Sequence, residues 1–165
     1  MKFTRSTISQ LFAMLALAAS GAAFASGNHA GGHGHDEGGE TAIGKPGVAA
    51  KASRTITIEM SDKMRFTPSD LTVKKGETVR LIVKNTGQLK HELSLGTQEE
   101  LLEHLEQMRK FPGMEHDEPG KITLEPGKQG EIVWQVTKAG VVDFACLIPG
   151  HYEAGMKGTI KVGRK

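Results

Sequence analysis

Three side chains near the carboxyl end of the chain have types and spacing suited to binding a soft metal ion. Cys146, His151 and Met156 offer a thiol, an imidazole and a thioether, and four residues separate each successive pair. Phe144 and Cys146 alternate, so we expect the thiol to end a strand and to point inward. The Pro149-Gly150 pair then predicts a turn that returns His151 and Met156 to the same point.

A second imidazole from elsewhere in the chain is needed to complete a three-coordinate site. His91, Leu93 and Leu95 share one face of a predicted strand, which places His91 at the start of an inward row. Two imidazoles, a thiolate and a long axial thioether are the donor set of an electron-transfer copper site. Zinc also binds imidazole and thiolate, but a thioether adds little for zinc. The predicted ligands of one copper ion per domain are His91, Cys146, His151 and Met156.

The combination of these residues, rather than any single one, predicts metal binding. A lone cysteine is usually a small buried hydrophobe, and a methionine is usually part of a core. Cu(I) favours soft sites with few ligands, whereas Cu(II) favours tetragonal nitrogen and oxygen, so a fixed compromise reduces the rearrangement during electron transfer. Only metal ligation explains all four side chains together.

Composition limits the other classes of function. The 165 residues include 21 Lys and Arg against 19 Asp and Glu, so the chain has no strongly basic field and we expect no nucleic-acid partner. The single cysteine excludes an internal disulfide and a CxxC zinc or redox motif. Any role of Cys146 must use one sulfur.

Residues 1–25 resemble a cleaved export signal. Lys2 and Arg5 precede an apolar run at 11–19, and Ala23-Phe24-Ala25 fits a signal-peptidase site, so we expect cleavage after about Ala25. The run is shorter than the roughly 20 residues that cross a bilayer. We therefore expect a periplasmic protein without stable membrane insertion; an uncleaved tether is the alternative.

Residues 26–53 are predicted to form a flexible tail, because they are rich in glycine and lack apolar periodicity. The tail carries His29, His33 and His35, followed by Asp36. Such a cluster suits unselective capture of extra copper or another divalent ion. The alternative is a soluble linker with incidental histidines.

Residues 54–165 are predicted to form one all-β domain with a single short helix. Apolar residues alternate at 56–60, 79–83 and 132–136, and turn signals separate these runs, which predicts a sandwich or barrel. From Gln98 to Lys110, apolar residues instead recur at helical spacing, behind a Thr97-x-x-Glu100 capping box. The apolar positions of this helix are Leu101, Leu102, Leu105 and Met108.

The segment Phe144-x-Cys146-x₄-His151-x₄-Met156-Lys-Gly158, with a histidine 55 residues before the cysteine, resembles the cupredoxins, the plastocyanin and azurin group of blue copper proteins. The resemblance spans 54–165 and implies a Greek-key β-sandwich with type 1 copper at one end. It also implies that His151 emerges at an apolar docking patch. The residues expected to form that patch are Leu147, Ile148, Pro149 and Ala154.

One position departs from the soluble electron carriers of that group. Glu92 follows the first histidine, where those proteins usually have an asparagine that ties the two ligand loops together. A carboxylate there is expected to tune the potential or geometry of the site. Together with the tail and the helix, Glu92 makes the chain similar to periplasmic cupredoxins associated with copper tolerance.

Further soft atoms occur in and after the predicted helix. His104 and Met108 are one helical turn apart, and Met114 and His116 follow. These four residues are candidate ligands of a second Cu(I) site. The alternative is structural, with Met108 on the apolar face of the helix and the histidines toward solvent.

The resulting functional hypothesis is a copper-binding protein of copper tolerance and homeostasis. The alternative is a diffusible one-electron carrier between respiratory partners. Both need a transient protein partner, for redox or copper transfer. A copper oxidase or nitrite reductase would need another multi-histidine site, so an independent enzyme is not expected.

Overall fold

The fold was analysed in a computed structural model, which describes residues 40–111 and 118–164. The chain divides into compact units at 1–34 and 35–165, and every described residue lies in the second. Its elements in chain order are β1 (Lys45–Pro46), a 3₁₀ turn (Ala49–Lys51), β2 (Arg54–Ser61), β3 (Arg65–Thr67), β4 (Asp70–Lys74), β5 (Thr78–Asn85), β6 (His91–Gly96), α1 (Gln98–Lys110), β7 (Lys121–Leu124), β8 (Gln129–Gln135), β9 (Gly140–Ala145) and β10 (Lys157–Gly163).

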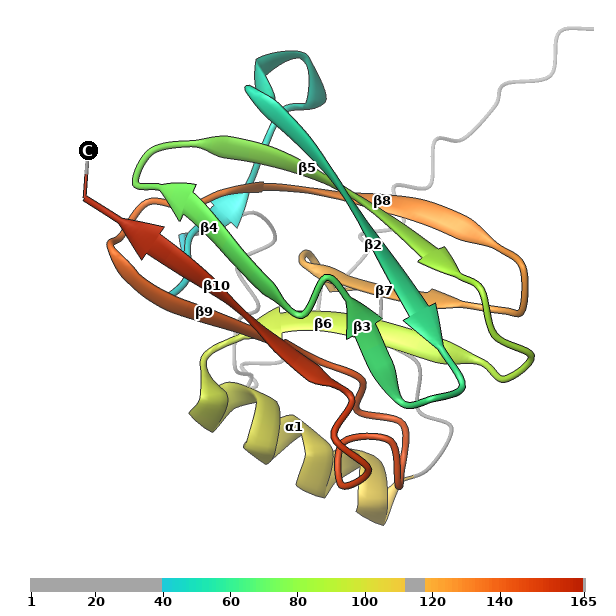
Figure 1. Cartoon of the computed structure of the whole chain (residues 1–165). Helices are drawn as coiled ribbons and strands as arrows, with labels where there is room; N and C mark the ends of the chain where they lie inside the picture. The colour runs from blue at the N-terminus through green and yellow to red at the C-terminus, as the bar shows by residue number, and fades with distance from the viewer. Residues whose placement is uncertain (1–39, 112–117, 165) are drawn as a thin grey trace, which may run out of the picture. The chain divides into compact units, whose positions relative to one another are not determined.

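Two five-stranded sheets face each other. One has the order β1-β8-β5-β2-β3 and the other the order β4-β10-β9-β6-β7. Figure 1 shows the two layers, with every strand except β1 labelled. The pairs β2 with β5 and β4 with β10 are parallel, and the remaining neighbours are antiparallel. The predicted all-β Greek-key sandwich with one helix is confirmed.

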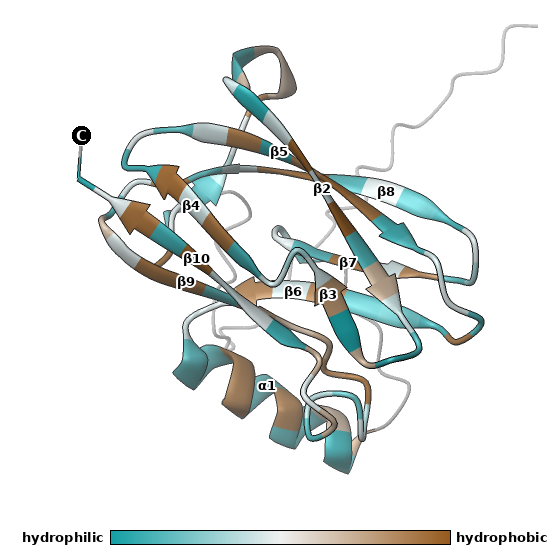
Figure 2. Cartoon of the chain, in the orientation of Figure 1, coloured by the Kyte–Doolittle hydropathy of each residue, from teal (hydrophilic) through white to brown (hydrophobic). Residues whose placement is uncertain are grey.

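The core follows the alternation read from the sequence. In β5, the inward residues Val79, Leu81 and Val83 are fully buried. In β8, Ile132 and Trp134 are 5% and 2% exposed, and Figure 2 shows the apolar residues of the strands alternating with polar ones. The second sheet contributes side chains such as Phe144 of β9 to the same core cluster, so each sheet turns one apolar face toward the core, which is the physical reason for the two-layer fold.

The folded unit begins before residue 54, so the predicted boundary at 53 is too late. In β1, Lys45 and Pro46 pair with Gln135 and Trp134 of β8. Ile43 is only 5% exposed and belongs to the core, and its carbonyl accepts a hydrogen bond from Trp134 Nε1 at 3.3 Å. A single buried side chain and a two-residue strand carry no periodicity, which explains why composition alone suggested a tail.

The predicted helix is confirmed with the same bounds. Its capping box is complete: Thr97 Oγ1 accepts from the Glu100 N–H at 3.2 Å, and the Glu100 carboxylate accepts from the Thr97 N–H at 2.7 Å. Leu101, Leu105 and Met108 are buried, but Leu102 is 40% exposed. The expectation that Leu102 belongs to the apolar face is wrong, because the helix buries only a narrow stripe.

Helix α1 lies against β6 and β9 on the outside of the second sheet (Figure 1). Leu101 and Leu105 pack with Ala145 and Leu147, and Tyr152 lies against this cluster. The helix therefore covers the sheet at the point where Cys146 leaves β9. This contact connects the insert with the segment that carries three of the predicted ligands.

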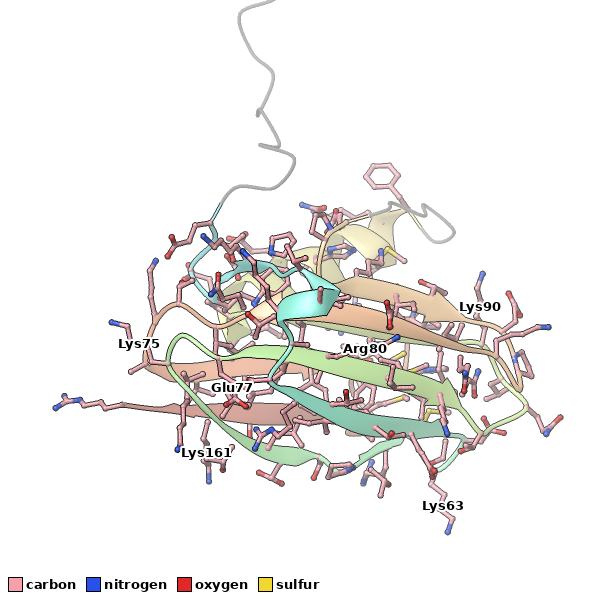
Figure 3. The ribbon with its side chains drawn as sticks, turned by 90° about the horizontal axis from the view of Figure 1, so that it is seen from above. Lys63, Lys75, Glu77, Arg80, Lys90 and Lys161 are labelled. Atoms are coloured by element: carbon pink, nitrogen blue, oxygen red, sulfur yellow. The ribbon has the colours of Figure 1, made fainter. Side chains whose placement is uncertain are left out.

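Charged side chains point outward at both ends of the sandwich. Figure 3 shows Lys63 and Lys90 at one end, and Lys75 and Lys161 at the other. Lys90 Nζ lies 3.5 Å from a carboxylate oxygen of Glu125.

Across residues 40–111 and 118–164, no helix is long and apolar enough to cross a membrane.

Candidate metal centre

The predicted ligands lie where several segments meet at one end of the sandwich. His91 is the first residue of β6, and Cys146 directly follows β9. The loop from Cys146 to Met156 is closed by backbone hydrogen bonds from Cys146 N–H to the Met156 carbonyl and from Met156 N–H to the His151 carbonyl, both 3.0 Å. The predicted turn is also present, with His151 N–H donating to the Ile148 carbonyl at 3.0 Å.

His91, Cys146 and His151 converge as predicted. One potential ligand atom from each lies within 4.8 Å of the other two, and this is the one such group of three or more His, Cys, Asp or Glu side chains within the described ranges. Cys146 Sγ lies 3.3 Å from His151 Nδ1. The two imidazole ring centroids are 5.0 Å apart. The three side chains can therefore bind one ion together.

The hydrogen bonding of His91 leaves one ring nitrogen for a metal. Its Nε2 lies 2.9 Å from Asp62 Oδ1, whereas Nδ1 is buried and has no hydrogen-bond partner. A buried polar atom without a partner costs roughly 1–3 kcal/mol. The unpartnered nitrogen, the neighbouring thiol and the second imidazole form the soft donor set that copper favours.

Burial keeps the thiol protonated in the metal-free protein. Cys146 is fully buried, and burial raises the pKa of its thiol to about 11. The Glu92 N–H, 3.4 Å from Sγ, opposes this shift by donating to the sulfur, while the negative charge of Glu92 adds to it. Metal binding must therefore displace a proton from this sulfur.

His151 differs from His91 in its access to solvent. It is half-buried, whereas His91 is fully buried. Burial is the main cause that lowers the pKa of His151, and the neighbouring His91 lowers it further. Both effects favour the neutral imidazole that a metal needs. His151 is thus the most solvent-exposed of the four predicted ligands.

The sequence and fold comparisons identify the family. A model described as "Copper binding proteins, plastocyanin/azurin family" matches residues 52–163. The chain belongs to the plastocyanin/azurin family of copper-binding proteins.

The chain is also similar to named copper-resistance proteins and to solved structures of auracyanins. "Copper-resistant cuproprotein CopI" of Rubrivivax gelatinosus is 50% identical over 94% of this chain and 92% of its own length, and the protein of that name from Vibrio cholerae is 40% identical over 73% of this chain and 72% of its own. Among solved structures, reduced auracyanin from Roseiflexus castenholzii has a TM-score of 0.58 and 25% identity, covering 68% of this chain and 98% of its own. Auracyanin A, a "blue" copper protein from Chloroflexus aurantiacus, has a TM-score of 0.55 and 25% identity, covering 66% and 98%.

Met156 is the fourth predicted ligand of this cupredoxin. Met156 is fully buried and shares the core cluster with Cys146. Its backbone hydrogen bonds join it to both Cys146 and His151. Its role as the axial thioether ligand stays a prediction.

The other predicted metal-binding residues give no second site within the described ranges. The tail residues His29, His33 and His35 lie outside them, as do Met114 and His116 of the proposed Cu(I) cluster. His104 is largely buried, with Nδ1 3.9 Å from a Glu118 carboxylate oxygen, and Met108 is buried on the helix. The structural alternative is therefore correct for Met108, which lies on the apolar face of the helix. It is wrong for His104, which it expected to face solvent.

Glu92 does not tie the ligand loops together with its side chain. The carboxylate accepts hydrogen bonds from Ser94 Oγ at 3.1 Å and Thr123 Oγ1 at 3.3 Å, and lies 3.5 Å from Lys121 Nζ. Its side chain and that of Lys121 are 3% and 6% exposed. Glu92 influences the site through its backbone N–H, which donates to Cys146 Sγ, and through its negative charge, which adds to the rise of the Cys146 pKa.

The ligand loop is braced from both sides. Arg65 Nη1 donates to the Ala154 carbonyl at 2.7 Å and to the Met64 carbonyl at 2.6 Å. Arg109 of α1 donates to the Glu153 carboxylate. Gly155 has φ +97°, and a Cβ there would lie 2.8 Å from Arg65 Nη1, so the close approach of arginine requires glycine.

The expected apolar patch around His151 needs one correction. Leu147 is fully buried beneath α1 and does not reach the surface. Ile148 is half-buried, and Pro149 and Ala154 are exposed. Sequence reasoning placed Leu147 on the surface because the helix that covers it comes from a distant part of the chain.

Three residues around the site were missed by the sequence analysis. Asp62 contacts His91 and Lys121 pairs with Glu92, as described above. Asn85 Nδ2 donates to the carbonyls of Leu89 and Leu124 at 2.7 and 2.9 Å, which shapes the segment before His91. Of these, only Asn85 carried a signal, because Asn85-Thr86-Gly87 is one of the turn signals that separate the predicted strands.

Proposed function

We propose that this cupredoxin binds one copper ion through His91, Cys146, His151 and Met156 and acts in copper resistance in the periplasm. The convergence of the two imidazoles and the thiol is the observation that supports the site. The function is supported by the relatives named copper-resistant cuproprotein, which match most of the chain. The export-like sequence of residues 1–25 supports the location.

Copper held by these residues would supply a one-electron couple between Cu(I) and Cu(II). The chain's own contribution is a set of ligands fixed before binding. His91 and Cys146 are buried, and the loop from Cys146 to Met156 is closed by backbone hydrogen bonds. The donor atoms therefore have little freedom to move when a metal binds. The half-buried His151 provides a route for the transfer of an electron or of copper to a protein partner. We propose no independent enzymatic activity.

The proposal is tested by complementation. Cells lacking this protein would be supplied with the full chain, with Cys146→Ala, or with a chain lacking residues 26–39. The deletion stops before residue 40, because Ile43 and β1 belong to the folded unit. We expect growth in copper to be restored by the full chain and lost with Cys146→Ala. Full tolerance with Cys146→Ala would contradict the role of the site.

The deletion separates the two candidate functions. The auracyanin neighbours and the solvent-accessible His151 favour the one-electron carrier as the second candidate. If the tail captures extra copper for tolerance, the deletion lowers growth in copper while leaving the redox cycling of the purified domain intact. Unchanged growth of the deletion, together with unchanged growth of Cys146→Ala, would favour the electron carrier.

A further inference from the structure

The ring of His91 is held by a carboxylate on the side opposite the proposed metal. Nε2 lies 2.9 Å from Asp62 Oδ1, and Nδ1 is the buried nitrogen without a partner. The ring is fully buried, whereas the Asp62 side chain is 37% exposed. Asp62 therefore stands between solvent and the imidazole without entering the site itself.

Asp62 is itself held in place by the segment that leads into β6. Its Oδ2 accepts from the Gln88 N–H at 2.7 Å, and its Oδ1 accepts from the Leu89 N–H at 3.2 Å. Gly87 is packed so closely that a Cβ there would lie 2.0 Å from Oδ1. The Asp62 carboxylate thus holds both the chain segment that precedes His91 and the His91 ring.

Two physical effects follow from this arrangement. A carboxylate that accepts a hydrogen bond from Nε2–H selects one tautomer, which leaves the lone pair of Nδ1 for a metal, and it makes the imidazole a stronger donor. A fixed negative charge behind a ligand also stabilises the more highly charged metal ion. The selected tautomer serves either oxidation state, whereas the stronger donor and the fixed negative charge favour Cu(II) over Cu(I).

We propose that Asp62 is a positioning residue that holds His91 as the Nε2–H tautomer and biases the copper site toward Cu(II). The proposal rests on the proposed copper site, because it assigns Nδ1 of His91 to the metal. The competing explanation is that Asp62 only holds the segment before β6 in place, through its hydrogen bonds from the Gln88 and Leu89 N–H groups. That explanation predicts an effect on stability without a selective change in the two oxidation states.

Three variants of the full chain separate these explanations. Asp62→Asn keeps an oxygen acceptor for the ring and removes the charge. Asp62→Ala removes both. Glu59→Gln is the matched control, since it removes one negative charge from an exposed position of the neighbouring strand β2. Circular dichroism would establish that each variant is folded.

The first measurement uses copper. The Cu(II) and Cu(I) affinities and the reduction potential would be compared with those of the wild type. We expect Asp62→Asn to lose about 10–100-fold in Cu(II) affinity. The loss for Cu(I) should be about tenfold smaller, which raises the potential by about 59 mV. Equal losses for both ions, or an equal rise in Glu59→Gln, would overturn the proposed bias.

The second measurement uses the metal-free protein. Imidazole nitrogen chemical shifts report which ring nitrogen of His91 carries the proton. We expect the Nε2–H tautomer in the wild type and in Asp62→Asn, and a mixture in Asp62→Ala. A single unchanged tautomer in Asp62→Ala would overturn the positioning role. A wild-type protein with the Nε2–H tautomer that binds no copper would instead overturn the proposed function and, with it, the copper bias.

Discussion

Helix α1 is expected to stabilise the ligand loop through Leu105. This side chain is 2% exposed and packs with Leu101, Ala145 and Leu147, the last of which directly follows Cys146. Leu105→Ala removes a buried side chain from this cluster and leaves a cavity. The free energy of unfolding should therefore fall by about 2–5 kcal/mol. Guanidinium unfolding of the metal-free protein measures this change.

Leu102→Ala is the matched control, because it makes the same substitution on the same helix at a position that is 40% exposed. It should change the free energy of unfolding by no more than about 0.5 kcal/mol. The loosened loop should also release copper faster in Leu105→Ala than in Leu102→Ala. Equal stability of the two variants, or equal copper release rates, would refute the idea that the helix braces the site.

Three further predictions concern protons, charge and capping. Because burial raises the pKa of the Cys146 thiol to about 11, copper binding releases a proton, and the apparent copper affinity should rise about tenfold per pH unit between about pH 7 and pH 9. A competing chelator of known protonation measures this slope, and a flat profile would contradict it. Lys121→Met leaves the buried Glu92 carboxylate uncompensated and should cost about 3–5 kcal/mol in chemical unfolding, so a neutral result would show that the pair is dispensable. Thr97→Ala breaks the capping box with Glu100 and should cost about 1 kcal/mol by the same assay; no loss would mean that the cap is not needed.

The parts of the fold that were predictable are those encoded by local sequence patterns within one strand or helix. Alternating apolar residues in β5 and β8 and the capping box before α1 are local patterns, and each is imposed by the geometry of one element. The close approach of three predicted ligands, Cys146, His151 and Met156, was predictable for a related reason. They occupy one short segment whose turn returns the chain to its start.

The parts that were not predictable depend on contacts between distant segments. Leu102 and Leu147 were misplaced because only the docking of α1 decides which leucine is covered. The contact of Asp62 with His91 joins positions 29 residues apart, and an aspartate in a turn has no distinguishing spacing. Ile43 joined the core through a two-residue strand, which is too short for any periodicity.

The central claim is that Cys146 binds copper together with His91 and His151. The visible spectrum of the copper-loaded domain, recorded beside that of Cys146→Ala, tests it most directly. The account predicts an intense thiolate-to-Cu(II) absorption band in the wild type and its loss in the variant. A colourless, zinc-filled wild-type protein, or a band that survives in Cys146→Ala, would contradict the account.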